Sequence, residues 1–202
     1  MLHNINYIKG EPAVPPKTKI TRDMILDAAF EIVRSEGAEN INARSISAKL
    51  GCSTQPVLYH FKKIEEIKKA TYHKADKFHS IYITDIQGEN PMKEIGMRYI
   101  QFGLEEKNLF RFLFQSNEFC GKSVSQLTNA EELQPIIAIL FQAAQVSTEQ
   151  AKTIFRSLFL FAHGYSSMFA NNELEYDEKT ILSDFNLVFD GLIYALKENF
   201  KI

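Results

Sequence analysis

Apolar residues recur at steps of three and four through most of this chain, and no segment alternates apolar and polar residues in the manner of a strand. The first spacing is typical of helices that bury one face, whereas alternation would indicate a half-buried strand. We therefore predict an all-α fold of about nine helices. They are expected over residues 21–37, 42–50, 54–61, 64–83, 91–106, 108–115, 135–144, 148–170 and 177–199.

Residues with short polar side chains precede many of these apolar runs. Such a side chain can accept a hydrogen bond from a free N–H group of the first turn, which favours a helix start. The residues expected in this role are Thr21, Asn42, Ser53, Asn108, Ser147 and Asp177. Gln150 lies three positions after Ser147, which is the spacing of a capping box. Gly37 and Gly51 are expected to end the first two helices, because glycine adopts left-handed conformations without a Cβ penalty.

The stretch from Asn42 to Phe61 is interpreted as a DNA-binding helix-turn-helix motif with its tight turn at Gly51. The second helix of such a motif enters the major groove and presents its first residues to the base edges. Gln55 can offer its amide to adenine, and Pro56 an apolar surface to a thymine methyl group. The hydroxyl groups suited to phosphate oxygens are those of Ser53, Thr54 and Tyr59. The residues expected to pack inward are Val57, Leu58 and Phe61.

Residues 21–68 also resemble the N-terminal domain of TetR/AcrR-type transcriptional repressors. The matching residues are Thr21, Ile25, Ala28, Ala29, Gly37, Arg44, Ile46, Leu50, Gly51, Ser53, Tyr59, His60 and Phe61. The chain departs from the usual pattern at Leu58, where the family has tyrosine, and at Ile64, where it has lysine. Tyr59, Lys62 and Lys63 are available to replace those phosphate contacts. The residues expected to contact DNA are Arg44, Ser53, Thr54, Gln55, Pro56, Tyr59, His60, Lys62 and Lys63.

The resemblance implies a role for the rest of the chain as well. Family members typically hold a small-molecule effector inside a C-terminal helical body, and the effector changes the spacing of two recognition helices and releases the operator. The segments EEKNLFRFLF and FAHG resemble one type of C-terminal domain in this family. The residues expected to contact the effector are Tyr99, Phe102, Phe110, Phe114, Arg156, Phe159, His163 and Tyr165. They favour an apolar or aromatic effector with an anionic part for Arg156, although ordinary core packing is the simpler interpretation of any single aromatic.

The last two helices, over residues 148–170 and 177–199, are apolar around much more than one face. A helix of this kind needs packing partners on two sides. We expect one side to pack on the body and the other on a second copy of the chain, which would give a homodimer with a four-helix interface. The alternative is that both helices are only core.

The net charge differs between the N-terminal part of the chain and the rest. Residues 1–75 hold 12 Lys and Arg against 8 Asp and Glu, a net of +4, whereas residues 76–202 hold 11 against 17, a net of −6. A basic N-terminal part on an acidic body is typical of a DNA-binding protein, although a solvated face is the simpler interpretation of so small a margin. At 202 residues and 45% hydrophobic, the chain can bury a large core.

Three segments are predicted: a mobile N-terminal extension over residues 1–17, a helix-turn-helix domain over 18–63, and a helical regulatory and dimerisation domain over 64–202. The extension is rich in proline, which disfavours regular structure. No apolar run is long enough to span a bilayer, and the first residues lack the apolar core of a signal peptide. We therefore expect a cytoplasmic protein.

Catalysis and metal binding have little support. The histidines do not combine with carboxylates or cysteines at ligand spacing, and no glycine-rich phosphate loop is present, so we expect no metal, no cofactor and no enzyme activity. These histidines are His3, His60, His73, His79 and His163. Cys52 and Cys120 are far apart and are expected to be small buried residues. The alternative function is a helical adaptor that binds only proteins, which would leave Gln55, Pro56 and Tyr59 without a role.

Overall fold

The computed structural model describes residues 19–88, 90–116, 123–124, 126 and 133–198. Within this part of the chain the backbone forms nine α-helices, one short 3-10 helix and no strand, so the all-α prediction is confirmed. The helices are α1 (Arg22–Glu36), η1 (Ala38–Asn40), α2 (Ala43–Lys49), α3 (Thr54–His60), α4 (Ile64–Thr84), α5 (Pro91–Glu105), α6 (Lys107–Phe114), α8 (Gln134–Ala144), α9 (Thr148–Asn171) and α10 (Glu178–Lys197). The predicted extension over residues 1–17 lies outside the described residues.

Hydrogen bonds at the helix starts confirm most of the predicted caps. Thr21 Oγ1 accepts from the backbone N–H of Met24 (3.2 Å). Asn42 Oδ1 accepts from the backbone N–H groups of Arg44 and Ser45 (3.0 and 2.9 Å). The capping box at the start of α9 and the aspartate cap at the start of α10 are formed as well. These bonds satisfy N–H groups that have no partner within their own helix.

Two helix starts differ from the prediction. Ser53 precedes α3, but its side chain makes no capping hydrogen bond. Asn108 lies inside α6, because that helix begins at Lys107. The Asn108 side chain instead donates from Nδ2 to the backbone oxygen of Arg34 (3.1 Å) and accepts at Oδ1 from Arg111 Nη1 (3.0 Å). Asn108 therefore joins α6 to α1 rather than closing a helix end.

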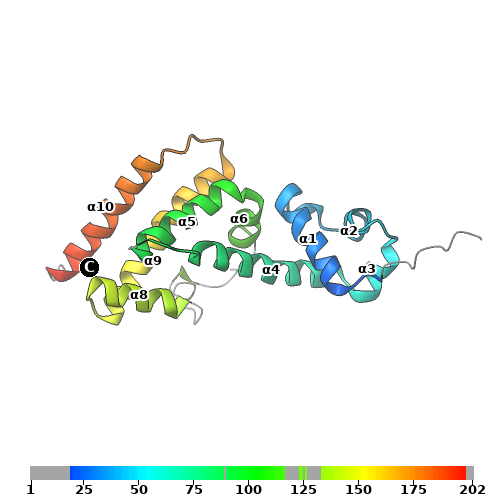
Figure 1. Cartoon of the computed structure of the whole chain (residues 1–202), viewed down its shortest axis with the longest axis horizontal. Helices are drawn as coiled ribbons and strands as arrows, with labels where there is room; N and C mark the ends of the chain where they lie inside the picture. Colours follow the sequence, from blue (N-terminus) through cyan, green and yellow to red (C-terminus); the bar gives the residue numbers. More distant parts are fainter. Residues whose placement is uncertain (1–18, 89, 117–122, 125, 127–132, 199–202) are drawn as a thin grey trace, which may run out of the picture.

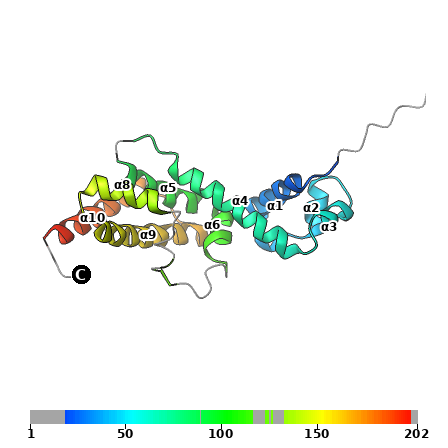
Figure 2. The same ribbon diagram turned by 90° about the horizontal axis from the view of Figure 1, so that it is seen from below.

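The molecule is elongated, and α1, α2 and α3 form a compact group at one end (Figure 1). We call residues 19–63 the N-terminal unit, and α5 to α10 the body. α4 runs from the unit into the body (Figure 2), packing against α1 on one side and against α5 and α6 further along. One continuous buried core extends from Ile25 and Val57 in the N-terminal unit to Phe102 in the body. The two parts are thus joined by packed side chains as well as by α4.

In the centre of the body, α5 and α9 approach each other closely. A Cβ atom on Gly103 of α5 would lie 2.6 Å from Cα and 2.8 Å from the backbone oxygen of Ser166 on α9. Ser166 Oγ donates across this contact to the backbone oxygen of Tyr99 (3.0 Å). Glycine is required at position 103 because a larger side chain would push the two helices apart.

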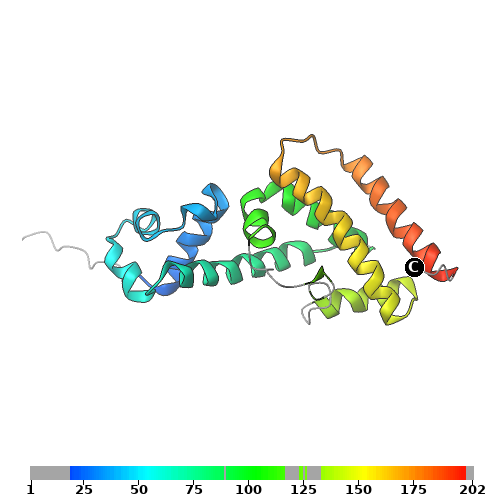
Figure 3. The same cartoon turned by 180° about the vertical axis from the view of Figure 1, so that it is seen from behind.

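α10 lies along α9 at the end of the body far from the N-terminal unit (Figure 3). Phe185 anchors it in the core, and the Tyr165 hydroxyl of α9 donates to Asp184 Oδ2 of α10 (2.7 Å). Apolar side chains nevertheless remain exposed on both helices. They are Leu160 and Met168 on α9, and Leu182, Leu187 and Tyr194 on α10.

Candidate functional site

The segment from α2 to α3 has the turn that the sequence predicts. Gly51 adopts a left-handed conformation with φ of +64°, which is unfavourable for a residue with a Cβ atom. The N–H group of Cys52 donates to the backbone oxygen of Ser47 (3.0 Å) and closes the turn. Ile46 on α2 and Val57 on α3 are fully buried. Both helices pack on α1, so the turn holds α3 at a fixed angle to the rest of the unit.

One face of α3 points to solvent and carries Gln55, Leu58 and Tyr59. Residues three and four positions apart lie together on one side of a helix. The prediction that Leu58 packs inward is wrong, because its side chain is 54% exposed, whereas Val57 and Phe61 are buried as predicted. Tyr59 is 75% exposed. The face therefore offers an amide, a phenol and an aliphatic group. The exposure of Leu58 could have been predicted from its position three residues after Gln55, on the same side of the helix.

The ring of His60 is engaged within the chain. Its Nε2 lies 3.0 Å from the backbone oxygen of Ile20, just before α1. A carbonyl oxygen only accepts, so Nε2 carries the proton and donates. The guanidinium of Arg22 lies 4.2 Å from the centroid of the Phe61 ring. Both contacts fasten the end of α3 to the start of α1, so His60 positions α3; its contact with DNA stays a prediction.

The other residues expected to contact DNA differ in accessibility. The exposed ones are Arg44, Ser53, Lys62 and Lys63, and the half-buried ones are Thr54 and Pro56. Arg44 belongs to the first turn of α2, and the two lysines form the link between α3 and α4. Exposed cationic groups at such places are free to neutralise phosphates.

Six of the residues expected to contact an effector come together in the body, around a histidine that sequence reasoning missed. We call this group the aromatic cluster; it consists of His79, Tyr99, Phe102, Phe110, Phe114, Phe159 and His163. The ring centroid of His79 lies 4.8 Å from that of Phe102 and 5.1 Å from that of Phe114. The Tyr99 hydroxyl and His163 Nδ1 are 3.0 Å apart and share a hydrogen bond. Spacing in the sequence does indicate that His79 is buried, because it continues a buried stripe of α4 at steps of four.

Burial perturbs the titratable groups of the aromatic cluster. It lowers the pKa of His79 to about 4, lowers the pKa of His163 and raises the pKa of Tyr99, because a charged form is poorly solvated away from water. His79 Nε2 is buried without a hydrogen-bond partner. Since buried polar groups are normally paired, this nitrogen is an unused hydrogen-bonding group inside an apolar environment.

The free energy of unfolding is expected to fall between pH 6.5 and about pH 4 in part because of His79. In the unfolded chain the imidazole binds a proton below its ordinary pKa of 6.5, whereas in the folded protein it stays neutral down to about pH 4. The unfolded state therefore binds more protons in this window, and stability decreases as the pH falls. The full shift corresponds to a loss of about 3 kcal/mol.

Urea denaturation of the wild type and of His79→Leu, at neutral pH and near pH 4.5, measures this contribution. Carboxylates titrate in both proteins, so only the difference between them reports on His79. The variant should lose less stability than the wild type on acidification. An equal loss in the two proteins would contradict the buried neutral histidine.

The other two residues expected to contact an effector are not part of the aromatic cluster. Tyr165 packs its ring against Phe161 and Phe169, and its hydrogen bond to Asp184 raises the pKa of the phenol. Arg156 is half-buried on α9, two turns before His163. The structure therefore places Tyr165 in the contact between α9 and α10.

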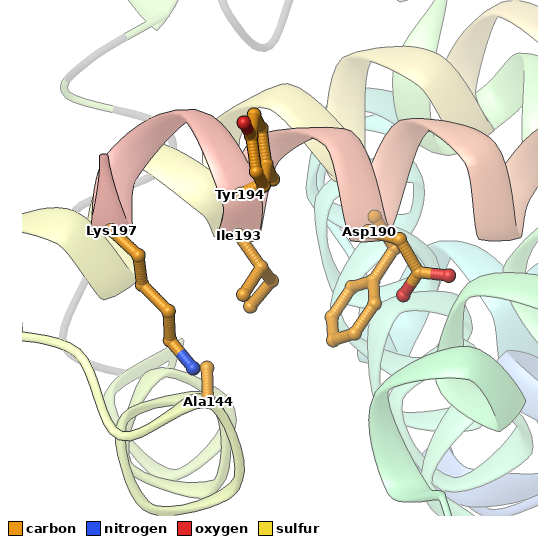
Figure 4. A pocket seen from close by; sticks show the side chains of 6 residues that line it. Ala144, Asp190, Ile193, Tyr194 and Lys197 are labelled. Carbon is orange, nitrogen blue, oxygen red and sulfur yellow. The ribbon is translucent and has the colours of Figure 1, made fainter. Parts of the chain in front are cut away.

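A separate pocket of about 370 Å³ lies between the end of α8 and the last turns of α10 (Figure 4). Its lining residues are Ala144, Phe189, Asp190, Ile193, Tyr194 and Lys197. Figure 4 shows that the lining comes almost entirely from α10, with Ala144 of α8 on the opposite side. None of the residues expected to contact an effector lines this pocket.

Metal-binding and membrane-spanning features were searched over the described ranges. In those ranges no group of three or more His, Cys, Asp or Glu side chains is arranged to hold a metal ion. Nor is any helix there both long and apolar enough to cross a membrane. Cys52 is a free and partly exposed thiol in the turn after α2, so the expectation that it is buried is wrong. Cys120 and His3 lie outside the described residues.

Comparison with known proteins finds similarity to YobS of Bacillus subtilis (strain 168), an uncharacterised HTH-type transcriptional regulator. The two chains are 20% identical over 177 residues, which cover 83% of this chain and 88% of YobS. The similarity therefore extends far beyond the motif at residues 42–61. No family model matches the chain, so membership of the TetR/AcrR family stays a prediction.

Proposed function

We propose that this chain is a sequence-specific DNA-binding transcriptional regulator of the TetR/AcrR type, with a binding role and no catalytic one. The observation that carries the proposal is the solvent-facing side of α3, where Gln55, Leu58 and Tyr59 lie on a helix held against α1 by the Gly51 turn. A helix held in this way is the part of a helix-turn-helix motif that enters the major groove. The similarity to YobS, itself called a transcriptional regulator, supports the same class.

On DNA, the exposed face of α3 reads the bases and its surroundings contact the backbone. Gln55 takes the amide contact with adenine, and Leu58 joins Pro56 as an apolar surface for thymine methyl groups. Tyr59, Lys62 and Lys63 contact phosphates, which supplies affinity without sequence preference. Arg44 contacts either a base or a phosphate.

The DNA-binding unit is a homodimer in this proposal. One short motif makes too few contacts for operator recognition, whereas two copies of α3 about 34–36 Å apart can read a palindrome on one side of the duplex. The exposed apolar residues of α9 and α10 support an interface formed by residues 148–170 and 177–199.

The aromatic cluster is the proposed effector site, and the protein is a repressor that an apolar or aromatic effector releases from DNA. His79 Nε2 lacks a partner there, so a ligand that bonds to it gains a contact that the free protein does not use. An effector lowers operator affinity only by its differential affinity for the two conformations, typically about 1–3 kcal/mol. Operator DNA must weaken the binding of a true effector by the same factor.

Selection of bound sequences from a pool of random duplexes tests the proposal. A regulator of this kind should enrich one palindromic sequence whose half-sites are separated by about one helical turn. Enrichment of no sequence, with equal retention of all duplexes, would contradict it and favour a protein-binding adaptor.

A further inference from the structure

A bidentate ion pair joins the N-terminal unit directly to the body. Arg34, in the last turn of α1, donates from Nε to both carboxylate oxygens of Glu106 (3.0 and 2.9 Å) and from Nη2 to Oε1. This contact raises the pKa of the Arg34 guanidinium. Glu106 is the single residue between α5 and α6, and its side chain is only 9% exposed. Bidentate charge-assisted bonds fix orientation as well as distance, unlike an exposed single contact.

Glu106 is itself held rigidly by its neighbours. Its N–H group donates to the backbone oxygen of Phe102 (2.9 Å), and its backbone oxygen accepts from the N–H group of Phe110 (2.8 Å). Both phenylalanines are fully buried in the aromatic cluster. The carboxylate of Glu106 therefore has a fixed position in the body, and α1 binds to it there.

The contact continues through α6 to the end of α9. Asn108 donates to the backbone oxygen of Arg34 and accepts from Arg111. Arg111 donates from Nε and Nη2 to the backbone oxygen of Ala170 in the last turn of α9 (3.0 and 2.5 Å). A chain of hydrogen bonds thus connects α1 with one of the two helices of the proposed dimer interface, by a route that does not use α4.

We infer that Arg34, Glu106 and Asn108 form a clamp that sets the orientation of α3 relative to the dimer interface, and with it the spacing of half-sites that the protein accepts. The inference rests on the proposed function, because it concerns two copies of α3 on one operator. α1 passes the orientation on to α3 through the contact of His60 with Ile20. Arg34 and Glu106 are positioning residues: they act on DNA recognition without contacting DNA.

The test compares three duplexes: the selected operator, the same operator with one base pair inserted between its half-sites, and a single half-site. Wild-type protein should prefer the operator over the lengthened duplex. Glu106→Gln keeps the shape of the side chain and removes its charge. It should lower the ratio of operator affinity to lengthened-duplex affinity at least tenfold, while its affinity for the single half-site stays within twofold of wild type. Asp27→Asn is the matched control, because it removes the more exposed ion pair of α1 with Lys74 on α4.

The outcomes separate the clamp from the proposed function. A Glu106→Gln protein that retains the wild-type spacing preference, or that weakens equally on all three duplexes, overturns the clamp alone. A wild-type protein that prefers no operator overturns both. If Glu106→Gln does not fold, Arg34→Lys is measured instead, because lysine keeps the charge but lacks the two-pronged donor. The same loss of spacing preference is expected, and a wild-type preference in that variant also overturns the clamp.

Discussion

Leu187→Glu is expected to convert the proposed dimer into monomers and to lower operator affinity at least a hundredfold. Leu187 is 75% exposed on α10, so a glutamate there should leave the fold of the single chain intact. In the proposed interface the same carboxylate would be removed from water without a partner, which is strongly unfavourable. A monomer binds only one half-site, so it loses the gain in affinity of about 100-fold to 10,000-fold that two linked contacts give.

Sedimentation at micromolar concentration and operator titration measure the two parts of this prediction. Ile81→Glu is the control, because Ile81 is 59% exposed on α4, outside the proposed interface. Phe189→Glu should also yield monomers or unfolded protein, but Phe189 is half-buried and lies beneath Lys93, so a charge there disturbs the body as well. A wild-type protein that sediments as a monomer, or a Leu187→Glu protein that remains dimeric, would contradict the interface.

Gln55→Ala and Lys63→Ala are expected to weaken DNA binding in different ways. Gln55 is exposed on the face of α3 that is proposed to read the bases, and each base contact contributes about 1–3 kcal/mol of discrimination. Its removal from both subunits should lower the ratio of operator to random-DNA affinity by about 10-fold or more. In the proposed complex Lys63 contacts phosphate, so its removal should weaken all duplexes equally and reduce the salt dependence by about one ion per subunit.

Titrations of both variants at two salt concentrations, against operator and shuffled duplexes of equal length, separate the two effects. Lys77→Ala, a lysine of α4 outside the predicted contacts, controls for the loss of one positive charge. An unchanged ratio for Gln55→Ala would show that this residue does not read a base. An altered sequence preference in Lys63→Ala would show that Lys63 contributes to base recognition, which contradicts its proposed role as a backbone contact.

The helix-turn-helix segment could be predicted because its signals are local. Asn42 caps α2 and Gly51 turns the chain through interactions within a few residues, and such interactions follow from residue type. The orientation of α3 about its own axis does not follow from local apolar signals, since Val57 and Leu58 are adjacent apolar residues about 100° apart around the helix. Packing of α3 against α1 and α2 decides which of them is buried, and no local apolar pattern indicates this, so the prediction for Leu58 is wrong.

Contacts between distant segments could not be predicted from one sequence. Arg34 and Glu106 are 72 positions apart, and no local pattern indicates that they meet. The set of residues that the family resemblance implied for an effector site contains six of the seven members of the aromatic cluster. It also contains Tyr165, which is two positions from His163 and therefore lies on nearly the opposite side of α9. His79 was overlooked because a histidine on a helix gives no sign of burial by its residue type alone.

The central claim, that this chain recognises a specific DNA sequence, is tested most directly by its binding to the DNA that flanks its own gene. The measurement is fluorescence anisotropy or a gel shift at one fixed salt concentration, with a shuffled duplex of the same length and composition as the comparison. A regulator of the proposed class should bind one flanking segment about a thousandfold or more tightly than the shuffled duplex. Equal affinity for every flanking and shuffled duplex would contradict the claim.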